Sequence, residues 1–372
     1  MRFLVIAGLA ESLLNFRGPL IEALQTKGFE VHVAAPQLQL GNATRLALEA
    51  KQLVVHDIPL RRTGTNPLTD LRTLYGLWRL MRRVKPDCVL GYTIKPVIYG
   101  SLAARLAGVP NRFALVTGLG YAFQSNTERK KLTTLVQYLY TIALAQTKKV
   151  FLQNPDDEQL FRQLGILRPG TSSTVVNGSG VCLERFPVTP LPNAEPSFLL
   201  IARLLGDKGV REYVLAAARV RARFPNAVFT LVGPLDENPD SISRAELQQW
   251  MDDDVVEYLG ELRDVRSAIT ASSVYVLPSY REGTPRTVLE AMAMGRPIIT
   301  TDAPGCRETV TDGENGFLVQ PKSVDQLEAA MLKFLNNPEL VGTMGARSLQ
   351  IVREKYDVHK VNASMLREMG IE

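Results

Sequence analysis

Cysteine and histidine, the residues that most often bind metals, occur only three times each in this chain of 372 residues. The cysteines lie far apart in the sequence, at Cys88, Cys182 and Cys306. They form no C-x-x-C pair, which argues against a disulfide scaffold and a zinc site and fits a reducing cytosol. The histidines are scattered too, at His32, His56 and His359, and we interpret each as a structural residue.

Long apolar runs are also absent. The sequence has no stretch of about eighteen apolar residues, which is what a membrane-spanning helix requires. The first residues, MRFLVIAGLAESLL, contain a short apolar run and then Glu11. We interpret this run as a first β-strand and not as a signal peptide. The sequence therefore predicts a cytoplasmic protein without a membrane span.

Charge is distributed unevenly along the chain, although its net value is only +5. Residues 1–185 contain 23 Lys and Arg against 12 Asp and Glu, a net charge of +11. The remaining residues contain 20 basic and 26 acidic side chains, a net charge of −6. This asymmetry predicts that the first half faces an anionic partner, for which nucleic acid and an anionic membrane surface both qualify. Because the sequence has no nucleic-acid-binding motif, we expect no nucleic acid partner.

Short apolar segments alternate with amphipathic stretches along the whole chain, which predicts parallel sheets wrapped by helices. The chain is long for one hydrophobic core. Arg185–Ser197 has four prolines among thirteen residues, and we place the linker between two domains there. The expected fold class is α/β, with two doubly wound, Rossmann-like domains, 1–185 and 186–356, facing a central cleft that binds ligands. The expected strands are 3–7, 31–35, 53–58, 88–90, 113–116, 150–153, 174–176, 198–201, 228–232, 255–259, 274–277 and 297–300.

The stretch Val274–Thr301 is predicted to form a strand, a loop, a short helix and a second strand. Thr284 is a suitable N-cap, and Pro285 suits the first helical position, where no backbone N–H is needed. Gly295 suits the position just after the helix, and Pro297 follows it. The helix is therefore expected to be short and well bounded at both ends.

The loop before this helix combines features that suit a phosphorylated, hydroxyl-rich ligand. Backbone N–H groups at a helix N-terminus favour anions, and Gly283 leaves room for a ligand to approach. Glu282 in the loop and Glu290 in the helix can accept hydrogen bonds from hydroxyl groups. Taken alone, each glutamate is more simply interpreted as a solvated surface charge.

Two cations follow an earlier predicted strand in the same way. Arg203 and Lys208 come after the strand 198–201, and Gly206 and Gly209 lie beside them. Such a loop suits a diphosphate, and an exposed basic loop without a ligand is the alternative. Gly8 similarly lets the loop after the first strand approach a ligand.

Together these residues resemble the signature of the retaining nucleotide-sugar glycosyltransferases of family 4. The similar segments are Glu282-Gly283-Thr284-Pro285 with Glu290, Ala202–Gly209, Pro304–Glu308 and Asn315–Val319. The resemblance covers nearly the whole chain. It implies the GT-B fold, with a first domain that binds the acceptor, a second that binds the nucleotide-sugar, and a last helix, 357–372, that crosses back onto the first domain.

The resemblance also implies roles for individual residues. Arg203 and Lys208 would neutralise the diphosphate that leaves the donor, so that neither a metal nor another cofactor is required. Glu282 would act at the donor sugar, either as a nucleophile or by orienting and stabilising it, and Glu290 would bind the ribose. The other expected nucleotide-sugar-binding residues are Gly8, Gly283, Thr284 and Pro285.

The chain departs from the family's pattern in two places. Thr117–Phe123 lacks the histidine that many members have there, and Cys182 stands where an aspartate is usual. The Gly-Leu-Gly-Tyr sequence within Thr117–Phe123 resembles a subgroup that builds capsule, O-antigen and N-glycan precursors on undecaprenyl diphosphate. We therefore expect transfer of an N-acetylhexosamine from a UDP-sugar to a lipid-diphosphate-linked saccharide. An epimerase of the same fold and a non-catalytic nucleotide-sugar-binding subunit are the alternatives.

Two stretches combine apolar residues at helical spacing with nearby basic residues, which suits a surface that rests on anionic lipid. The first has Leu71, Leu74, Tyr75, Trp78 and Met81 beside Arg72, Arg79, Arg82 and Arg83; the second has Leu132, Leu135, Val136, Leu139 and Ala143 between Arg129–Lys131 and Lys148–Lys149. A core-facing helix would show the same apolar stripe. The hypothesis is that the first domain lies peripherally on the inner face of the cytoplasmic membrane.

Overall fold

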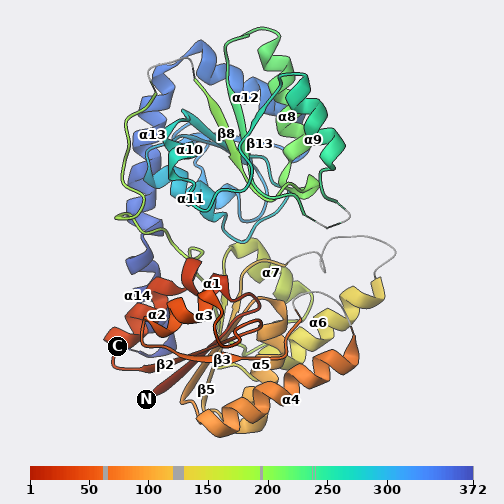
Figure 1. Ribbon diagram of the computed structural model, residues 1–372, viewed down its shortest axis with the longest axis vertical. Coiled ribbons are helices and arrows are strands. Elements are labelled where there is room, and N and C mark those ends of the chain that lie inside the picture. Colours follow the sequence, from red (N-terminus) through yellow and green to blue (C-terminus); the bar gives the residue numbers. More distant parts are fainter. Residues whose placement is uncertain (62–65, 120–129, 193–195, 237, 239, 372) are drawn as a thin grey trace. The chain divides into compact units, whose positions relative to one another are not determined.

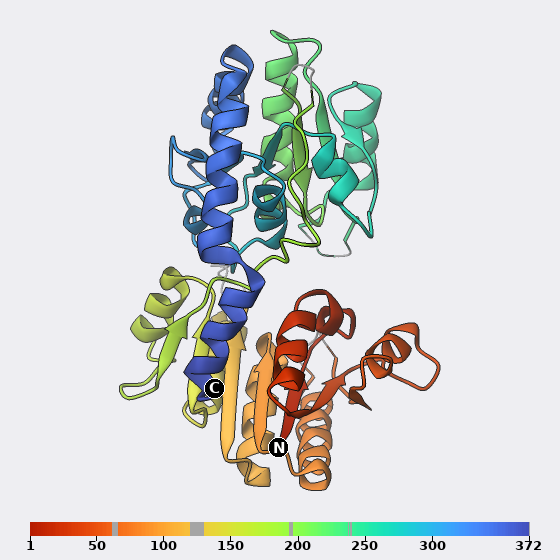
Figure 2. The ribbon, with the colours of Figure 1, turned by 90° about the vertical axis from the view of Figure 1, so that its left-hand side faces the viewer.

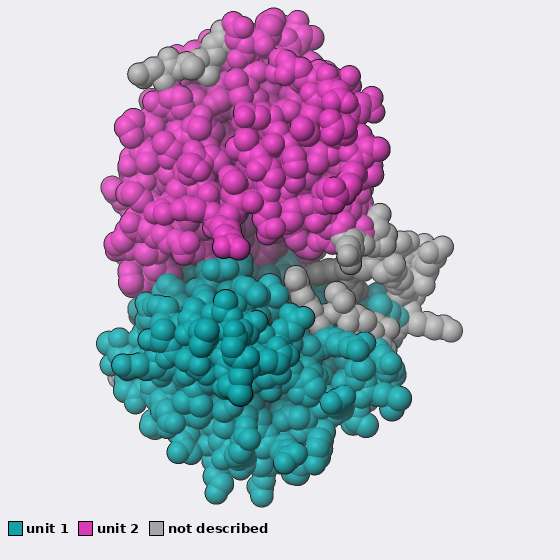
Figure 3. All heavy atoms as spheres, in the orientation of Figure 1, with its two compact units in different colours: residues 1–179, 361–372 teal, residues 180–360 magenta. Residues whose placement is uncertain are grey.

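The chain forms two compact units in a computed structural model (Figure 3). Unit 1 contains residues 1–179 and 361–372, and unit 2 contains residues 180–360. The sequence predicts a boundary at 185/186, inside the proline-rich segment. The structure describes residues 1–61, 66–119, 130–192, 196–236, 238 and 240–371.

Unit 1 contains a seven-stranded parallel sheet with the order β3-β2-β1-β4-β5-β6-β7 (Figure 1). Its strands are β1 (Arg2–Ile6), β2 (Glu30–Ala35), β3 (Val54–Asp57), β4 (Cys88–Tyr92), β5 (Asn111–Val116), β6 (Lys149–Leu152) and β7 (Ser173–Val175). Successive side chains of β1 enter opposite core layers, with Phe3 and Val5 on one face and Leu4 and Ile6 on the other. Burial on both faces is typical of parallel sheets.

Helices cover both faces of this sheet. One face packs against α1 (Glu11–Asn15), α2 (Gly18–Thr26), α3 (Ala43–Glu49) and the end of α14 (Val358–Met369). The other packs against α4 (Pro67–Val84), α5 (Ile94–Ala107), α6 (Lys130–Leu144) and α7 (Pro155–Gln163). The strand order reverses between β1 and β4, and in such sheets that point is where ligands bind.

Residues 361–372 belong to unit 1, and Figure 2 shows their helix, at the end marked C, beside the strands of that unit. Met365 is fully buried and belongs with Leu366 and Met369 to the core layer that contains β1. Glu368 accepts from Lys149 Nζ at 2.5 Å. Lys149 is therefore an ion-pair partner of the C-terminal helix, and its assignment to a basic lipid-facing surface was wrong.

The apolar stripe predicted on α4 is split between core and surface. Met81 is 1% exposed, and Leu74 and Trp78 are half-buried against the core layer of α4 and α5, so their assignment to an exposed surface was wrong. Leu71 and Tyr75 are 62% and 58% exposed. The apolar face of this helix is wider than the part of the helix that packs against the core. The apolar side chains at its edge therefore stay exposed.

The second predicted helix behaves similarly. On α6, Ala143 is buried and Leu139 and Val136 are half-buried, whereas Leu135 is 51% exposed. Of the basic residues expected at its start, Arg129 and the side chains of Lys130 and Lys131 lie outside the described part of the chain.

Unit 2 contains a six-stranded parallel sheet with the order β10-β9-β8-β11-β12-β13. Its strands are β8 (Phe198–Ile201), β9 (Phe229–Val232), β10 (Glu257–Tyr258), β11 (Val274–Leu277), β12 (Ile298–Thr301) and β13 (Gly316–Val319). The sequence analysis assigned no strand to β13. β13 begins at Gly316, and the Asn315-Gly316 dipeptide is typical of a turn, so the sequence gives no strand signal there.

The helices of unit 2 form two layers about this sheet. One layer is centred on α8 (Val210–Arg221) and α12 (Val324–Asn336), with contributions from α9 (Arg244–Asp252) and α13 (Glu339–Ile351). The other consists of α10 (Arg266–Thr270), α11 (Arg286–Ala293) and the π-helical turn η5 (Val352–Tyr356). Two 3₁₀ turns, η3 (Gly206–Lys208) and η4 (Arg307–Thr309), follow β8 and β12.

A buried guanidinium attaches the proline-rich segment to unit 2. Arg296 has no exposed surface, and it donates to the carbonyl oxygens of Thr189 at 3.0 Å, Pro190 at 3.1 Å and Ser272 at 2.8 Å. Burial lowers the pKa of Arg296 to about 10. Because several carbonyl groups replace water around the cation, the segment is fixed to the unit that follows it.

None of the helices in the described residues is both long and apolar enough to cross a membrane.

Candidate active site

The strand order of unit 2 brings the predicted charged residues together. β8 pairs directly with β11 in parallel, so both strands end at the same edge of the sheet. Arg203 follows β8, Lys208 ends η3, and Glu282 lies in the loop after β11. This edge is where ligands bind in open parallel sheets.

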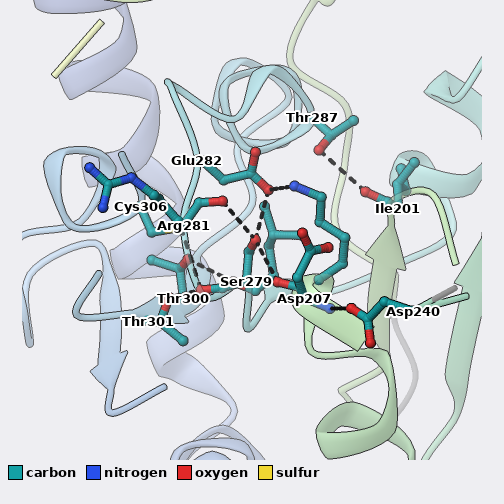
Figure 4. Close-up of polar contacts among 12 residues, drawn as sticks. Ile201, Asp207, Asp240, Ser279, Arg281, Glu282, Thr287, Thr300, Thr301 and Cys306 are labelled. Atoms are coloured by element: carbon teal, nitrogen blue, oxygen red, sulfur yellow. Dashed lines mark hydrogen bonds and ion pairs between the residues drawn. The ribbon is translucent and has the colours of Figure 1, made fainter. Parts of the chain in front are cut away.

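Lys208 and Glu282, the latter labelled in Figure 4, form an ion pair across this edge. The distance from Lys208 Nζ to Glu282 Oε1 is 2.5 Å, and the two side chains are only 16% and 18% exposed. Burial disfavours the Lys208 ammonium, but the charge and hydrogen bond of Glu282 outweigh it and raise the pKa of Lys208. Lys208 is therefore a cation held at the strand ends by a carboxylate.

Arg203 is the more accessible of the two predicted cations. Its Nη1 donates to Asp236 Oδ2 at 2.8 Å, and its side chain is 48% exposed. It lies close enough to Lys208 that its charge acts to lower the pKa of that residue. The two positive charges together suit an anionic ligand better than either does alone.

The loop that carries Glu282 is held by backbone contacts from two other loops. The backbone N–H of Glu282 donates to Pro304 O at 2.9 Å, and that of Tyr280 donates to Asp207 O at 2.9 Å. Gly305 has φ +81°, and a Cβ there would lie 2.5 Å from Gly283 O and closer still to Glu282 O. Only glycine therefore fits where the 304–305 turn presses against the loop.

Side-chain contacts that the sequence analysis missed add to this support. Tyr280 Oη donates to Glu212 Oε1 of α8 at 2.5 Å. The ammonium of Lys322 lies 5.0 Å from the centre of the Tyr280 ring. These partners come from residues far away in the sequence, so no local signal identifies them.

Helix α11 begins one residue later than predicted. Pro285 is the N-cap, with ψ 109°, and Arg286 is the first helical residue, so the assignment of Thr284 as N-cap was wrong. A proline restricts the residue before it to extended backbone, which keeps Thr284 in the loop. Gly295, at φ +80°, follows the helix as predicted.

Glu290 is buried within α11 and is 7% exposed. Arg286 Nε, one turn earlier, donates to its Oε1 at 2.9 Å. Burial raises the pKa of Glu290, and the charge of Arg286 works against that rise. The predicted ribose-binding carboxylate is thus already paired with a cation from its own helix.

Gly8 belongs to unit 1, at the carboxyl end of β1. A Cβ at Gly8 would lie 2.9 Å from Thr93 Oγ1, so glycine allows the ends of β1 and β4 to approach each other. Thr93 has φ +69°, an unusual value for a β-branched residue. These features lie where the strand order of unit 1 reverses.

The two departures from the expected pattern are only partly described. Of Thr117–Phe123, residues 120–123 lie outside the described residues, and Leu119 is buried. Cys182 is half-buried, and its Sγ donates to Glu184 Oε2 at 3.1 Å. Burial together with Glu184 raises the pKa of Cys182, which favours an unreactive thiol.

Each half of the chain matches a known glycosyltransferase family. The glycosyl transferase 4-like family matches residues 7–154, and the glycosyl transferases group 1 family matches residues 195–337. The second match contains β8, β11, α11 and all of the predicted site residues except Gly8.

The chain is also similar over most of its length to glycosyltransferases from bacteria. It is 29% identical to the N,N'-diacetylbacillosaminyl-diphospho-undecaprenol alpha-1,3-N-acetylgalactosaminyltransferase of Campylobacter jejuni, with 91% of each chain covered. It is also 29% identical to the UDP-Gal:alpha-D-GlcNAc-diphosphoundecaprenol alpha-1,3-galactosyltransferase of Escherichia coli, over 76% of this chain and 75% of that protein.

Solved structures share the fold at lower sequence identity. Sucrose-phosphate synthase from Thermosynechococcus elongatus aligns with a TM-score of 0.81 at 19% identity, covering 99% of this chain and 98% of that one. The Anabaena protein HepE in complex with UDP aligns with a TM-score of 0.77 at 18% identity over the whole of both chains. These likenesses confirm the predicted GT-B fold. The two family matches and the relatives that align over 91% and 76% of the chain show that it belongs to the glycosyltransferases, and its fold makes it a GT-B member.

Proposed function

We propose that this protein is a retaining glycosyltransferase that moves a sugar from a UDP-sugar to an undecaprenyl-diphosphate-linked saccharide. We propose an N-acetylhexosamine as the sugar and bacterial surface polysaccharide or glycan assembly as the process. The C. jejuni and E. coli relatives support the lipid-linked acceptor, since both act on sugars joined to diphospho-undecaprenol. The UDP-bound neighbour supports the nucleotide.

The observation that carries this proposal is the Lys208–Glu282 pair at the adjacent ends of β8 and β11. Breaking a sugar–diphosphate bond leaves negative charge on the diphosphate and positive charge on the anomeric carbon. A cation and a carboxylate that touch each other can each stabilise one of these charges. A basic loop without a carboxylate would stabilise only the negative charge on the diphosphate.

The proposed roles follow from this division. Lys208 and the accessible Arg203 hold the departing diphosphate, and Glu282 faces the anomeric carbon of the sugar. Glu290 binds the ribose, while the backbone of Gly283, Thr284 and Pro285 contacts the sugar and phosphate. Gly8, in unit 1, is the remaining proposed nucleotide-sugar-binding residue. We propose that neither a metal nor a cofactor takes part, so a chelator should leave turnover unchanged.

The test is release of UDP from a panel of UDP-sugars, with and without a lipid extract from a polysaccharide-producing bacterium. The proposal predicts release that depends on the extract and on one sugar, which identifies the donor. Release that ignores the extract would indicate hydrolysis or a soluble acceptor. A product formed without acceptor and without UDP release would indicate an epimerase.

Unit 1 is the proposed site of contact with the acceptor and with the inner face of the cytoplasmic membrane. The exposed apolar residues on three neighbouring helices support this idea: Leu68, Leu71 and Tyr75 on α4, Leu106 on α5, and Leu135 and Tyr138 on α6. α4 and α6 both pack against α5, so the six side chains belong to one helical layer. Exposed arginines of α4 accompany them, at Arg72, Arg79, Arg82 and Arg83. Apolar side chains with adjacent cations suit an anionic lipid surface.

Sedimentation with phosphatidylglycerol vesicles tests this part of the proposal. The double substitution Leu71→Glu and Tyr75→Glu should abolish co-sedimentation, because it places two negative charges on the layer. Leu215→Glu is the control, since Leu215 is 55% exposed but lies in unit 2. Equal binding by all three proteins would contradict membrane contact through α4.

A further inference from the structure

The side chain of Ser279 lies between the loops that carry the two predicted catalytic charges. Ser279 is fully buried and follows β11 by two residues. Its Oγ lies 2.8 Å from Glu282 Oε1, 3.2 Å from Asp207 O and 3.3 Å from Arg281 O. One hydroxyl proton can serve only one of these acceptors at a time. The carboxylate is both the nearest and the charged acceptor, so the proton is donated to Glu282.

Glu282 therefore has two donors on the same oxygen. Lys208 Nζ and Ser279 Oγ both bond Oε1, at 2.5 and 2.8 Å. Lys208 reaches this oxygen through a flexible stem, and any diphosphate bound at the site would compete for its ammonium. The serine side chain is short, buried and uncharged, so its hydrogen bond to Glu282 does not depend on what Lys208 binds.

We propose that Ser279 is a positioning residue that fixes the direction of the Glu282 carboxylate during sugar transfer. This inference rests on the proposed function, because it takes Glu282 to act at the donor sugar. A catalytic carboxylate has to be held within a fraction of an ångström of its productive position by side chains that cannot move themselves.

The backbone of Ser279 meets that requirement. Its carbonyl oxygen accepts hydrogen bonds from Thr301 Oγ1 and from Cys306 Sγ, the latter at 3.8 Å (Figure 4). Thr301 ends β12, and both donors are fully buried. Burial raises the pKa of Cys306 to about 12, so its thiol keeps the proton that it donates. Ser279 is thus fixed from β12 and its following loop on one side and holds Glu282 on the other.

The test compares the steady-state rate of sugar transfer by the wild-type protein and by Ser279→Ala, with radiolabelled UDP-sugar. Loss of the hydroxyl should lower kcat about tenfold, the equivalent of one hydrogen bond to a charged group, and change KM for the donor less than about twofold. In a Glu282→Ala background the same substitution should have no effect on kcat. A residue that acts through Glu282 has nothing left to position once that carboxylate is gone.

Two further variants separate positioning from folding. Ser272→Ala also removes a buried hydroxyl from unit 2, where Ser272 donates to Ile269 O at 3.0 Å, and it should lower Tm without changing kcat. Thr301→Val removes a bond to the Ser279 carbonyl at constant volume. It should lower kcat only when Glu282 is present, and it replaces Ser279→Ala if that variant does not fold.

The possible outcomes distinguish this inference from the proposed function. Full activity of Glu282→Ala would overturn the proposed function together with the role of Ser279. Loss of activity on Glu282→Ala but not on Ser279→Ala or Thr301→Val would overturn the inference alone. An equal loss of kcat in both backgrounds would also overturn it, because it would show that Ser279 acts independently of Glu282.

Discussion

Two residues of opposite charge, Lys208 and Glu282, neutralise each other at the centre of the site. The Lys208 ammonium and the Glu282 carboxylate lie 2.5 Å apart with little exposed surface. Removing one member of such a pair leaves a buried charge without its counter-ion, which is costly. The pair therefore has a structural role as well as its proposed catalytic one, and single substitutions will affect both.

Replacing Lys208 by glutamine removes the charge and keeps much of the side-chain volume. We expect kcat to fall about 100-fold, because a preorganised cation at a departing diphosphate contributes at that level, and KM for the UDP-sugar to rise. Steady-state kinetics over a range of donor concentrations measure both. Arg219→Gln is the control, since Arg219 forms an exposed ion pair with Asp325 in the same unit. An unchanged kcat for Lys208→Gln would contradict the role of this cation.

The types of the site residues could be predicted from the sequence, but most of their partners could not. Short motifs identify Lys208 and Glu282, yet 74 positions separate them, and their contact depends on β8 pairing with β11. Nothing in the sequence states that strand order. Ser279 was missed for the same reason, because a single serine becomes informative only when the carboxylate beside it is known.

At the scale of elements, the loop after β11 is shaped by the turn that follows β12. Gly305 lies against the carbonyl oxygens of Glu282 and Gly283, where a side chain has no space. The two loops are neighbours because their strands pair directly. A substitution in the turn is therefore expected to act on the loop.

Gly305→Ala tests this dependence. Its Cβ would overlap the backbone of the loop, so we expect kcat/KM to fall at least about tenfold and Tm to decrease. Gly313→Ala is a matched control, because Gly313 has nearly the same φ, +79°, but no atom within 4 Å of an added Cβ. It should cost about 1–2 kcal/mol of folding free energy through backbone strain alone and leave the activity per folded molecule unchanged. Equal kinetics for both variants would contradict the coupling of the loops.

Most elements of the sheets follow from short apolar runs, and the errors have local physical causes. β13 was missed because Asn315-Gly316 is typical of a turn, and Gly316 gives no strand signal. The start of α11 was placed one residue early because Thr284 and Pro285 both suit an N-terminus. The stripe on α4 was assigned to the surface, although Met81 lies in the core. A periodic pattern shows that a face is apolar but not what covers it.

At the scale of the whole molecule, the chain returns to its first unit at the end. Residues 361–372 belong to unit 1, although the preceding 181 residues, 180–360, form unit 2. Met365 is fully buried in the core layer with Phe3 and Phe113. The stability of unit 1 is therefore expected to depend on residues at the opposite end of the sequence.

Met365→Ala measures this dependence. We expect the free energy of unfolding to fall by about 2–5 kcal/mol, as for other large side chains removed from a core. Urea denaturation followed by circular dichroism gives this quantity. Arg367→Ala, an exposed position on the same helix, should change it by less than about 0.5 kcal/mol. If both variants unfold at the wild-type urea concentration, the C-terminal helix does not stabilise the unit.

The central claim is that the Lys208–Glu282 site transfers a sugar from UDP to a lipid-linked acceptor. The most direct test supplies a radiolabelled UDP-N-acetylhexosamine and an undecaprenyl-diphosphate-linked sugar and measures label in the organic-extractable lipid. We predict label in the lipid for the wild-type protein, with at least about a 100-fold lower rate per folded molecule for Glu282→Gln. Label that stays in the aqueous phase as free sugar, or equal rates for the two proteins, would contradict the account.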